Sequence, residues 1–253
     1  MDLGLKGLRA IVTGGTKGIG LAIAQTLAAE GCHVAICSRH AAEAKATATN
    51  LAESGITAYG TGTDVSDGLA LAAFVEEAAE MLGGLDIVVA NVSALAIGHD
   101  EESWKKGFDT DLMGTVRLVN AALPYLERSA AASIVTISSV SGREIDFASG
   151  PYGVFKAALV HYTQGLAFSL APKHIRANTV SPGNTYFRGG VWNSIEGNNP
   201  TLFAEALALN PTGRMATPQE IANAAVFLAS PAASFVYGTN LVVDGALTRG
   251  VQL

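Results

Sequence analysis

The sequence is poor in the residues that define disulfide-rich, metal-binding or basic proteins. Among 253 residues there are two cysteines, five histidines and 16 basic residues against 22 acidic ones, which gives a formal net charge of −6. The histidines show no ligand spacing and the carboxylates do not cluster, so we expect no metal site. An acidic chain without a basic segment is also a poor candidate for binding nucleic acid or an anionic membrane.

The cysteines and the apolar runs exclude further classes. Cys32 and Cys37 flank one expected strand five positions apart, so their side chains point to opposite faces and cannot bridge locally; we expect two reduced core residues. Asp, Asn or Gly interrupts each apolar stretch before it reaches membrane length, and Met1-Asp2-Leu3 does not begin a secretory signal. These features predict a cytoplasmic protein. Since no linker or low-complexity segment divides the chain, we expect a single domain over residues 1–253.

What the sequence has is a regular alternation of short apolar runs and longer helical patterns. The runs predict strands at 8–12, 33–37, 56–60, 86–90, 132–138, 175–180 and 240–243. The helical patterns cover 19–30, 41–54, 68–82, 101–128, 150–171 and 218–229. This alternation predicts an α/β protein with a doubly wound parallel sheet and helices on both faces. The unbroken apolar segment Ile87-Val88-Val89 fits a strand that is buried on both faces.

A glycine-rich turn joins the first strand to the first helix. It reads TGGTKGIG over residues 13–20 and directly follows the apolar run at 8–12. Glycines let the backbone turn tightly and approach a pyrophosphate, and the following helix presents unpaired N–H groups and the positive end of its dipole. Glycines also end elements for purely structural reasons, so the turn alone is weak evidence. The strand, turn and helix order favours a dinucleotide site.

A second group of residues has the chemistry needed to reduce a carbonyl. Tyr152 and Lys156 lie one turn apart on one face of the helix expected over 150–171. A free tyrosine titrates near 10, but one unit charge at about 4 Å in an effective dielectric near 20 is worth roughly 4 kcal/mol, enough to make a phenol a usable acid near neutral pH. Ser139, thirteen residues before Tyr152, adds a hydroxyl. Together they supply a proton donor, a cation and a polarising group.

These motifs resemble those of the short-chain dehydrogenase/reductase family, and the resemblance covers essentially the whole chain. It is carried by TGGTKGIG at 13–20, Asp64-Val65, Asn91, Ser139, YGVFK at 152–156, IRANTVSPG at 175–183 and VVDG at 242–245. The chain is similar to the compact branch that includes 3-oxoacyl-carrier-protein reductases, carbonyl reductases and hydroxysteroid dehydrogenases. The resemblance implies a Rossmann fold with a seven-stranded parallel sheet, a nicotinamide cofactor, and hydride exchange between a carbonyl and an alcohol.

The resemblance also implies roles for individual residues. Tyr152 would donate the proton, Ser139 would polarise the carbonyl oxygen, and Lys156 would assist Tyr152 and hold the nicotinamide ribose. The cofactor contacts that it implies, apart from Tyr152 and Lys156, are Gly14, Thr16, Lys17, Gly18, Ile19, Gly20, Ser38, Arg39, Asp64, Val65, Asn91, Pro182, Gly183 and Thr185.

The chain departs from the family pattern in three places. The usual Asn-Asn-Ala-Gly after the fourth strand reads ANVS over 90–93. Asp111 stands where the pattern Asn-Leu-x-Gly supplies a fourth catalytic residue; its carboxylate could pair with Lys156, hold a proton-relay water, or be kept neutral by burial. Phe187 replaces the threonine expected to face the nicotinamide amide, with Thr185 two residues earlier.

The choice of cofactor can be argued from charge. An enzyme that prefers NAD usually carries an acidic residue at the end of the second strand, where it binds the ribose 2′-hydroxyl. That place holds Ser38 and Arg39, and Arg39 can pair with a 2′-phosphate. Lys17 projects toward the same region, and His40 could approach the adenosine phosphate. Each cation alone could be an ordinary solvated side chain, but both together favour NADP(H), with an NAD-dependent alcohol dehydrogenase of the same fold as the alternative.

Substrate is expected outside the carboxyl ends of the strands. The candidate substrate residues are Ser93, Ile145, Phe187 and Trp192. A largely apolar pocket favours a hydrophobic or alicyclic ketone, although Arg188 could bind an acidic substrate. The expected activity is therefore that of an NADP-dependent carbonyl reductase or alcohol dehydrogenase.

Two further expectations concern the oligomeric state and whether the protein turns over its cofactor. The stretches 101–128 and 150–171 carry many small residues, and in the family these helices form subunit contacts, so the resemblance implies a homotetramer; burial against the sheet explains part of the pattern. A non-catalytic NADP(H)-sensing protein is an alternative. The altered segment 90–93 and Asp111 favour it, and the intact Ser, Tyr and Lys set opposes it.

Overall fold

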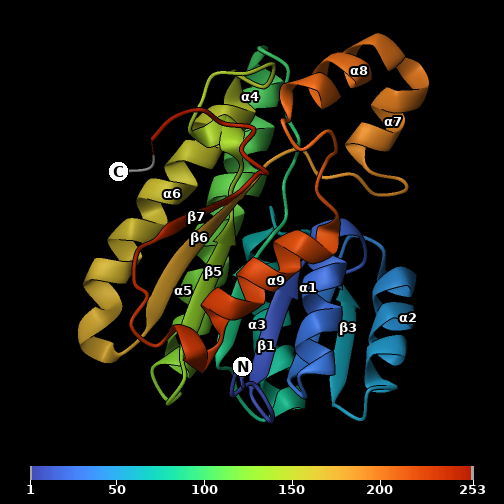
Figure 1. Cartoon of the computed structure of the whole chain (residues 1–253). Coiled ribbons are helices and arrows are strands. Elements are labelled where there is room, and N and C mark those ends of the chain that lie inside the picture. Colours follow the sequence, from blue (N-terminus) through green and yellow to red (C-terminus); the bar gives the residue numbers. More distant parts are fainter. Residues whose placement is uncertain (1, 252–253) are drawn as a thin grey trace.

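The computed structural model describes residues 2–251, which form a seven-stranded parallel sheet in the order β3-β2-β1-β4-β5-β6-β7 (Figure 1). The strands are β1 (Arg9–Thr13), β2 (His33–Ser38), β3 (Ala58–Gly62), β4 (Ile87–Ala90), β5 (Ser133–Ile137), β6 (Arg176–Pro182) and β7 (Asn240–Val243). The chain runs outward from β1 to β3 and then returns to start again at β4 beside β1. This order confirms the predicted doubly wound sheet, and its switch point lies between β1 and β4.

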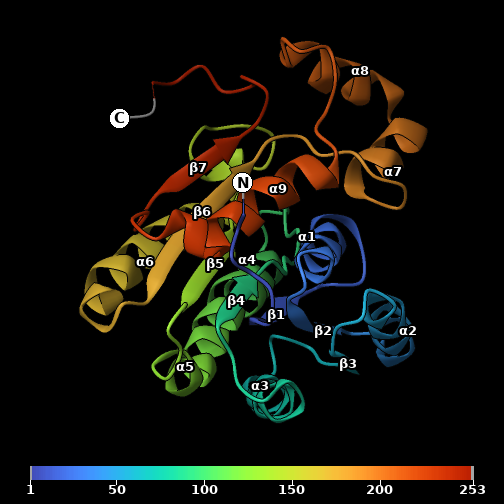
Figure 2. The ribbon, with the colours of Figure 1, turned by 60° about the horizontal axis from the view of Figure 1, so that its bottom comes forward.

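Helices cover both faces of the sheet (Figure 2). They are α1 (Gly18–Ala29), α2 (Ala41–Ala52), α3 (Gly68–Leu82), α4 (Glu101–Gly107), α5 (Gly114–Leu126), α6 (Pro151–Leu170), α7 (Val191–Asn198), α8 (Pro200–Leu209) and α9 (Pro218–Ala229). One hydrophobic core joins α1 and α9 to the sheet, and a second joins α3, α5 and α6 to its other face. Alternate residues of the central strands feed the two cores: Val89 lies in the first and Val88 in the second.

The stretch 101–128 is not one helix, as the sequence pattern suggests. It consists of α4, a π-helical segment over Phe108–Met113, and α5. The wider turn inserts extra backbone within an otherwise continuous helical path, a feature that often marks a functional site. It also buries Asp111, which is 1% exposed. The other boundaries shift by a few residues; β3, for example, begins at Ala58.

Two smaller expectations concern the cysteines and the membrane. Cys32 and Cys37 are buried with free thiols, one in each core, and burial raises the pKa of each thiol to about 12. Within residues 2–251, every helix is too short or too polar to cross a membrane.

A buried carboxylate at the amino-terminal side of the sheet ties β1 to β4. Asp86 accepts two hydrogen bonds from the Arg9 guanidinium at 2.7 and 2.8 Å, one from the Arg9 amide at 2.9 Å and one from Ser129 Oγ at 2.5 Å. Burial by itself would raise the pKa of Asp86, but the hydrogen bonds from Arg9 and Ser129 and the charge of Arg9 hold the pKa below its usual value.

This arrangement predicts part of the acid sensitivity of the fold. The pKa of Asp86 is lower in the folded state than in the unfolded state. The ionised Asp86 side chain therefore stabilises the fold at pH values above the ordinary carboxyl pKa of about 4, and this stabilisation is lost as pH falls through the pKa of the folded protein. Asp86→Asn should lower the free energy of unfolding by about 3 kcal/mol at neutral pH. The variant should also lose less stability than the wild type on acidification, as measured by urea denaturation at a series of pH values. Equal pH slopes in the two proteins would contradict this assignment.

Candidate active site

The predicted site residues gather where the strands end. Gly14 follows β1, Ser38 ends β2, Asp64 and Val65 follow β3, Asn91 follows β4, Ser139 follows β5, and Pro182 ends β6 ahead of Gly183. Since all seven strands are parallel, these positions share one edge of the sheet. The fold therefore brings to one edge residues as far apart in the chain as Gly14 and Gly183.

The glycine turn after β1 is held by close backbone packing. Gly14 adopts a left-handed φ of 66°, and a side chain at Gly20 would clash with the Gly14 carbonyl oxygen and with the Asn91 amide. Asn91 donates from Nδ2 to the Thr13 carbonyl at 3.0 Å and from its backbone N–H to Thr13 Oγ1 at 3.1 Å. Asn91 thus fixes the end of β4 against the turn, whatever further contact it makes.

The start of α1 fits an anionic ligand. Lys17 precedes the helix without capping it through its side chain, and the first turn of α1 holds no acidic residue. In contrast, Asp67 caps α3 by accepting hydrogen bonds from Leu69 N and Ala70 N. The first N–H groups of α1 therefore have no side-chain partner from the protein and point out at the positive end of the helix dipole. A pyrophosphate fits this place.

Two cations flank the ends of β1 and β2. Lys17 and Arg39 are both exposed. Hydrogen bonds from Ser66 hold the pKa of Asp64 below its usual value, and the charge of Arg39 contributes in the same direction, so Arg39 lies near the loop after β3. Ser38 Oγ donates to the His40 carbonyl at 3.1 Å, which holds the Ser38 side chain against its own backbone turn.

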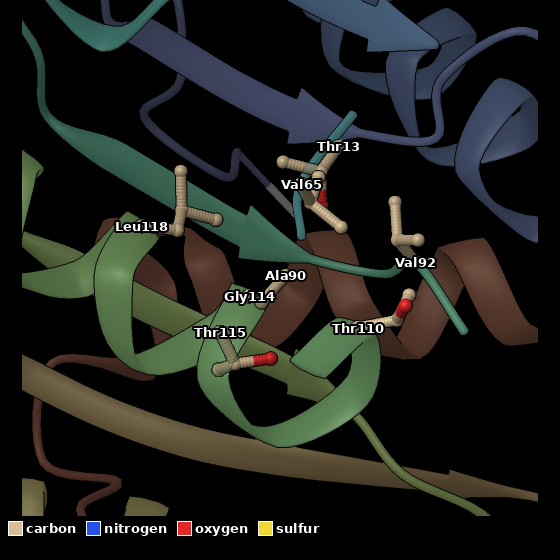
Figure 3. Close-up of a pocket in the computed structure, with 8 residues that line it drawn as sticks. All are labelled: Thr13, Val65, Ala90, Val92, Thr110, Gly114, Thr115 and Leu118. Atoms are coloured by element: carbon tan, nitrogen blue, oxygen red, sulfur yellow. The ribbon is translucent and has the colours of Figure 1, made fainter. Parts of the chain in front are cut away.

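A small cavity lies between the ends of β1 and β4 and the π-helical segment (Figure 3). Its volume is about 10 Å³, room for about one water molecule. It is lined by Thr13, Val65, Ala90, Val92, Thr110, Gly114, Thr115 and Leu118. This volume is too small for substrate or for a dinucleotide base.

A buried ion pair stands next to Tyr152. Lys156 Nζ lies 3.4 Å from Asp111 Oδ1, with the two side chains 3% and 2% exposed. The ammonium also donates to the Ile137 carbonyl at 3.1 Å and lies 5.6 Å from the centre of the Tyr152 ring. The predicted one-turn relation between Tyr152 and Lys156 thus holds in three dimensions. Of the alternatives left open for Asp111, the structure adopts the pair with Lys156.

Glycines bring Ser139 up to the same helix. Ser139 Oγ accepts a hydrogen bond from Ser141 N at 3.1 Å and begins a 3-10 turn over Val140–Gly142. A side chain at Gly142 would come within 2.7 Å of the backbone of α6, and one at Gly153 would come within 2.8 Å of the Ser141 carbonyl. In addition, Ser138 Oγ donates to the Lys156 carbonyl at 2.7 Å. These contacts seat the end of β5 directly on the helix that carries Tyr152.

The predicted substrate residues differ in how far they are exposed to solvent. Ile145 is 90% exposed, whereas Trp192 is buried and its ring meets Phe147 edge to face at 5.7 Å. Phe187 lies over Gly18, where its ring occupies the space that a side chain at Gly18 would need; it therefore borders the glycine turn. Thr185 is buried and donates to the Gly183 carbonyl at 3.1 Å.

Sequence reasoning named Lys156 as a possible partner of Asp111 but missed its two hydrogen-bond donors. Ser93 donates to Asp111 Oδ1 at 2.6 Å, and Ala94 N donates to Oδ2 at 2.8 Å. Ser93 is predicted to face substrate, but its hydroxyl is used within the protein. The one feature of the sequence that could have indicated this contact is that Ser93 and Asp111 both depart from the family pattern.

Comparison with known proteins identifies the family of this chain. A family model described as enoyl-(acyl carrier protein) reductase matches residues 14–248. Isoepoxydon dehydrogenase patN of Penicillium expansum is 42% identical over 100% of this chain and 99% of its own length. Cis-4-hydroxycyclohexanecarboxylate dehydrogenase of Sinomonas cyclohexanicum is 36% identical over 94% of this chain and 96% of its own.

A solved structure has the same fold. The 7α-hydroxysteroid dehydrogenase complexed with NADH and 7-oxo glycochenodeoxycholic acid superposes with a TM-score of 0.90 and 30% identity, over 97% of this chain and 96% of that one. The chain belongs to the short-chain dehydrogenase/reductase family, whose members are oxidoreductases that bind a nicotinamide cofactor.

Proposed function

We propose that the protein exchanges hydride between NADP(H) and a small alicyclic ketone or secondary alcohol. The observation that carries the proposal is the buried Lys156 ammonium beside the Tyr152 ring, on a helix against which the Ser139 turn is packed. This constellation supports the proposal because it combines a phenol, a cation and a hydroxyl from segments that pack together at the carboxyl edge of the sheet.

Each residue has a stated task. When bound, the nicotinamide supplies or accepts the hydride. Tyr152 gives its phenolic proton to the carbonyl oxygen during reduction and takes it back during oxidation. Ser139 hydrogen-bonds the same oxygen and stabilises the negative charge that develops there. Lys156 Nζ donates one hydrogen bond, to the Ile137 carbonyl, and is paired in charge with Asp111, so the ammonium keeps donor capacity for a ribose hydroxyl.

The relatives support the substrate class. One relative is named for a hydroxycyclohexanecarboxylate, and the solved neighbour holds an oxo derivative of a bile acid. Both names describe an oxidised or oxidisable carbon on an alicyclic skeleton that bears an acid. The exposed Arg188 lies one residue after Phe187 and offers a partner for such an acid.

The first test is a substitution of the proposed proton donor. The wild type should consume NADPH with a cyclohexenone or cyclohexanone carboxylate as substrate. Tyr152→Phe keeps the ring but removes the hydroxyl, so turnover should fall by roughly two to four orders of magnitude with cofactor affinity little changed. Tyr162→Phe is the matched control on α6, where burial raises the pKa of the phenol to about 12; it should retain turnover. Normal turnover in Tyr152→Phe would overturn the assignment.

The second test concerns the cofactor. Lys17 and Arg39 are exposed cations that follow β1 and β2, where they could flank a 2′-phosphate. The 7α-hydroxysteroid dehydrogenase structure contains NADH, so an NAD-dependent enzyme of the same fold is the alternative to be tested. Losing one charge-assisted contact costs about 1.5 to 3 kcal/mol. Arg39→Asp should therefore raise the KM for NADPH roughly ten- to a hundredfold and improve use of NADH. Lys45→Asp on α2 is the charge-matched control. A wild type that is equally efficient with NADH would refute the preference.

The third test concerns assembly. An exposed stripe runs along α6 at one-turn intervals through Val154, Ala157, His161, Gly165 and Phe168, and Phe168 is 87% exposed. We infer that a second copy covers this stripe and that the protein is a homotetramer.

A Cβ at Gly165 would meet nothing within 4 Å in its own subunit, so a larger side chain can leave the helix there without a clash at its base. Gly165→Arg should therefore lower the mass measured by light scattering below that of the wild-type tetramer. Gly197→Arg on α7, where a side chain also meets nothing within 4 Å, should leave the mass unchanged. A monomeric wild type at micromolar concentration would disprove the assembly.

A further inference from the structure

Two of the three places where this chain departs from the family pattern contact each other. Ser93 and Asp111 come from different segments, the loop after β4 and the π-helical segment, and are 18 positions apart. Ser93 Oγ donates to Asp111 Oδ1 at 2.6 Å and itself accepts from Leu95 N at 3.1 Å. Because Leu95 N can only donate, the hydroxyl proton of Ser93 must point to Asp111.

The surroundings of Asp111 require both of its side-chain oxygens to be hydrogen-bond acceptors. Oδ1 faces the Ser93 hydroxyl and the Lys156 ammonium, and Oδ2 faces the Ala94 amide. An ionised carboxylate accepts both hydrogen bonds and attracts the ammonium. An asparagine would turn its NH₂ group toward one of these donor groups and leave two donors face to face. The site is therefore built for an aspartate in its charged form.

The charged groups around Asp111 are few. Lys156 faces it from α6, and Tyr152 on the same helix is the other titratable group beside this pair. On α4 the cations Lys105 and Lys106 are exposed, and on α5 Arg117 donates to the Ser66 carbonyl. Asp109 and the exposed His99 are the titratable groups nearest in sequence on the π-helical segment and on the loop after β4.

We propose that Ser93 is a positioning residue that holds the Asp111 carboxylate against Lys156 and so limits how strongly Lys156 promotes loss of the Tyr152 proton. The inference rests on the proposed function. Paired with Asp111, the ammonium is part of a neutral pair, and its field at the phenol is weaker than that of an isolated charge. Ser93 acts through Asp111 and does not itself touch the reacting atoms.

Four variants test this through the pH profile of alcohol oxidation. Tyr152 must be ionised to accept the proton of the alcohol, so its titration sets the acidic limb of this profile. Asp111→Asn removes the compensating charge, so the acidic limb should move to lower pH by about one unit. Ser93→Ala should move the limb in the same direction by less, because the carboxylate loses one of its two hydrogen-bond donors. Ser93→Ala should add nothing in the Asp111→Asn background, and Ser93→Thr, which keeps the hydroxyl, should restore the wild-type limb.

A second readout does not depend on turnover. Tyrosinate absorbance can be titrated in the cofactor-free protein, and the difference between each variant with and without Tyr152→Phe isolates Tyr152. The same ordering of variants is expected. Ser129→Ala is the matched control, because it also removes a hydroxyl that donates to a buried aspartate, Asp86 at 2.5 Å, but far from the site; it should lower stability and leave both titrations unchanged.

The outcomes separate the two claims. If Tyr152→Phe retains turnover, the proposed function fails. If Tyr152→Phe is inactive but Ser93→Ala leaves the acidic limb and the titration of Tyr152 where they are in the wild type, the positioning role of Ser93 fails alone. Additive shifts in the double variant would likewise overturn the coupling between Ser93 and Asp111.

Discussion

A fully buried ammonium group must be compensated, and the site is organised around that need at Lys156. An unpaired charge in the interior costs several kcal/mol, so Lys156 requires both an opposite charge and hydrogen-bond acceptors. The carboxylate comes from the π-helical segment and the acceptor from the last carbonyl of β5. Three elements that are remote in sequence are thereby joined at one atom, next to the Tyr152 ring. The wide π turn is what lets Asp111 reach this position from a helix that otherwise faces the sheet.

The parts of the fold that follow from local patterns could be predicted from the sequence. Parallel strands that are buried on both faces form continuous apolar runs, as Ile87–Ala90 does, and the glycine turn is recognisable because strand, turn and helix are adjacent in the chain. The carboxyl edge of the sheet then places Ser139 near Tyr152 without further information. Gly142 and Gly153 show why the spacing works: each allows a backbone approach that a side chain would block.

The parts that could not be predicted depend on contacts between distant segments. A π turn and a continuous α-helix have nearly the same apolar spacing, so the pattern over 101–128 could not show the break at Phe108. The pairing of Ser93 with Asp111 is likewise invisible to periodicity. Each residue by itself reads as a loss from the family pattern. In the fold, the Asp111 carboxylate accepts hydrogen bonds from Ser93 Oγ and Ala94 N and pairs with the Lys156 ammonium, and these three contacts explain why the aspartate is tolerated in a buried place.

Charge is distributed unequally across the proposed site, and this bears on how an acidic protein would bind an anionic cofactor. The formal net charge of −6 opposes the approach of a dinucleotide, but exposed charges act over only about 10 Å at 0.1 M salt. Within that range the start of α1, Lys17 and Arg39 present positive potential at the phosphate end. At the opposite end the Lys156 charge is neutralised by Asp111. Such a gradient would orient the dinucleotide with its phosphates toward β1 and β2, leaving an almost neutral environment at Tyr152 in which the uncharged carbonyl group of the substrate can bind.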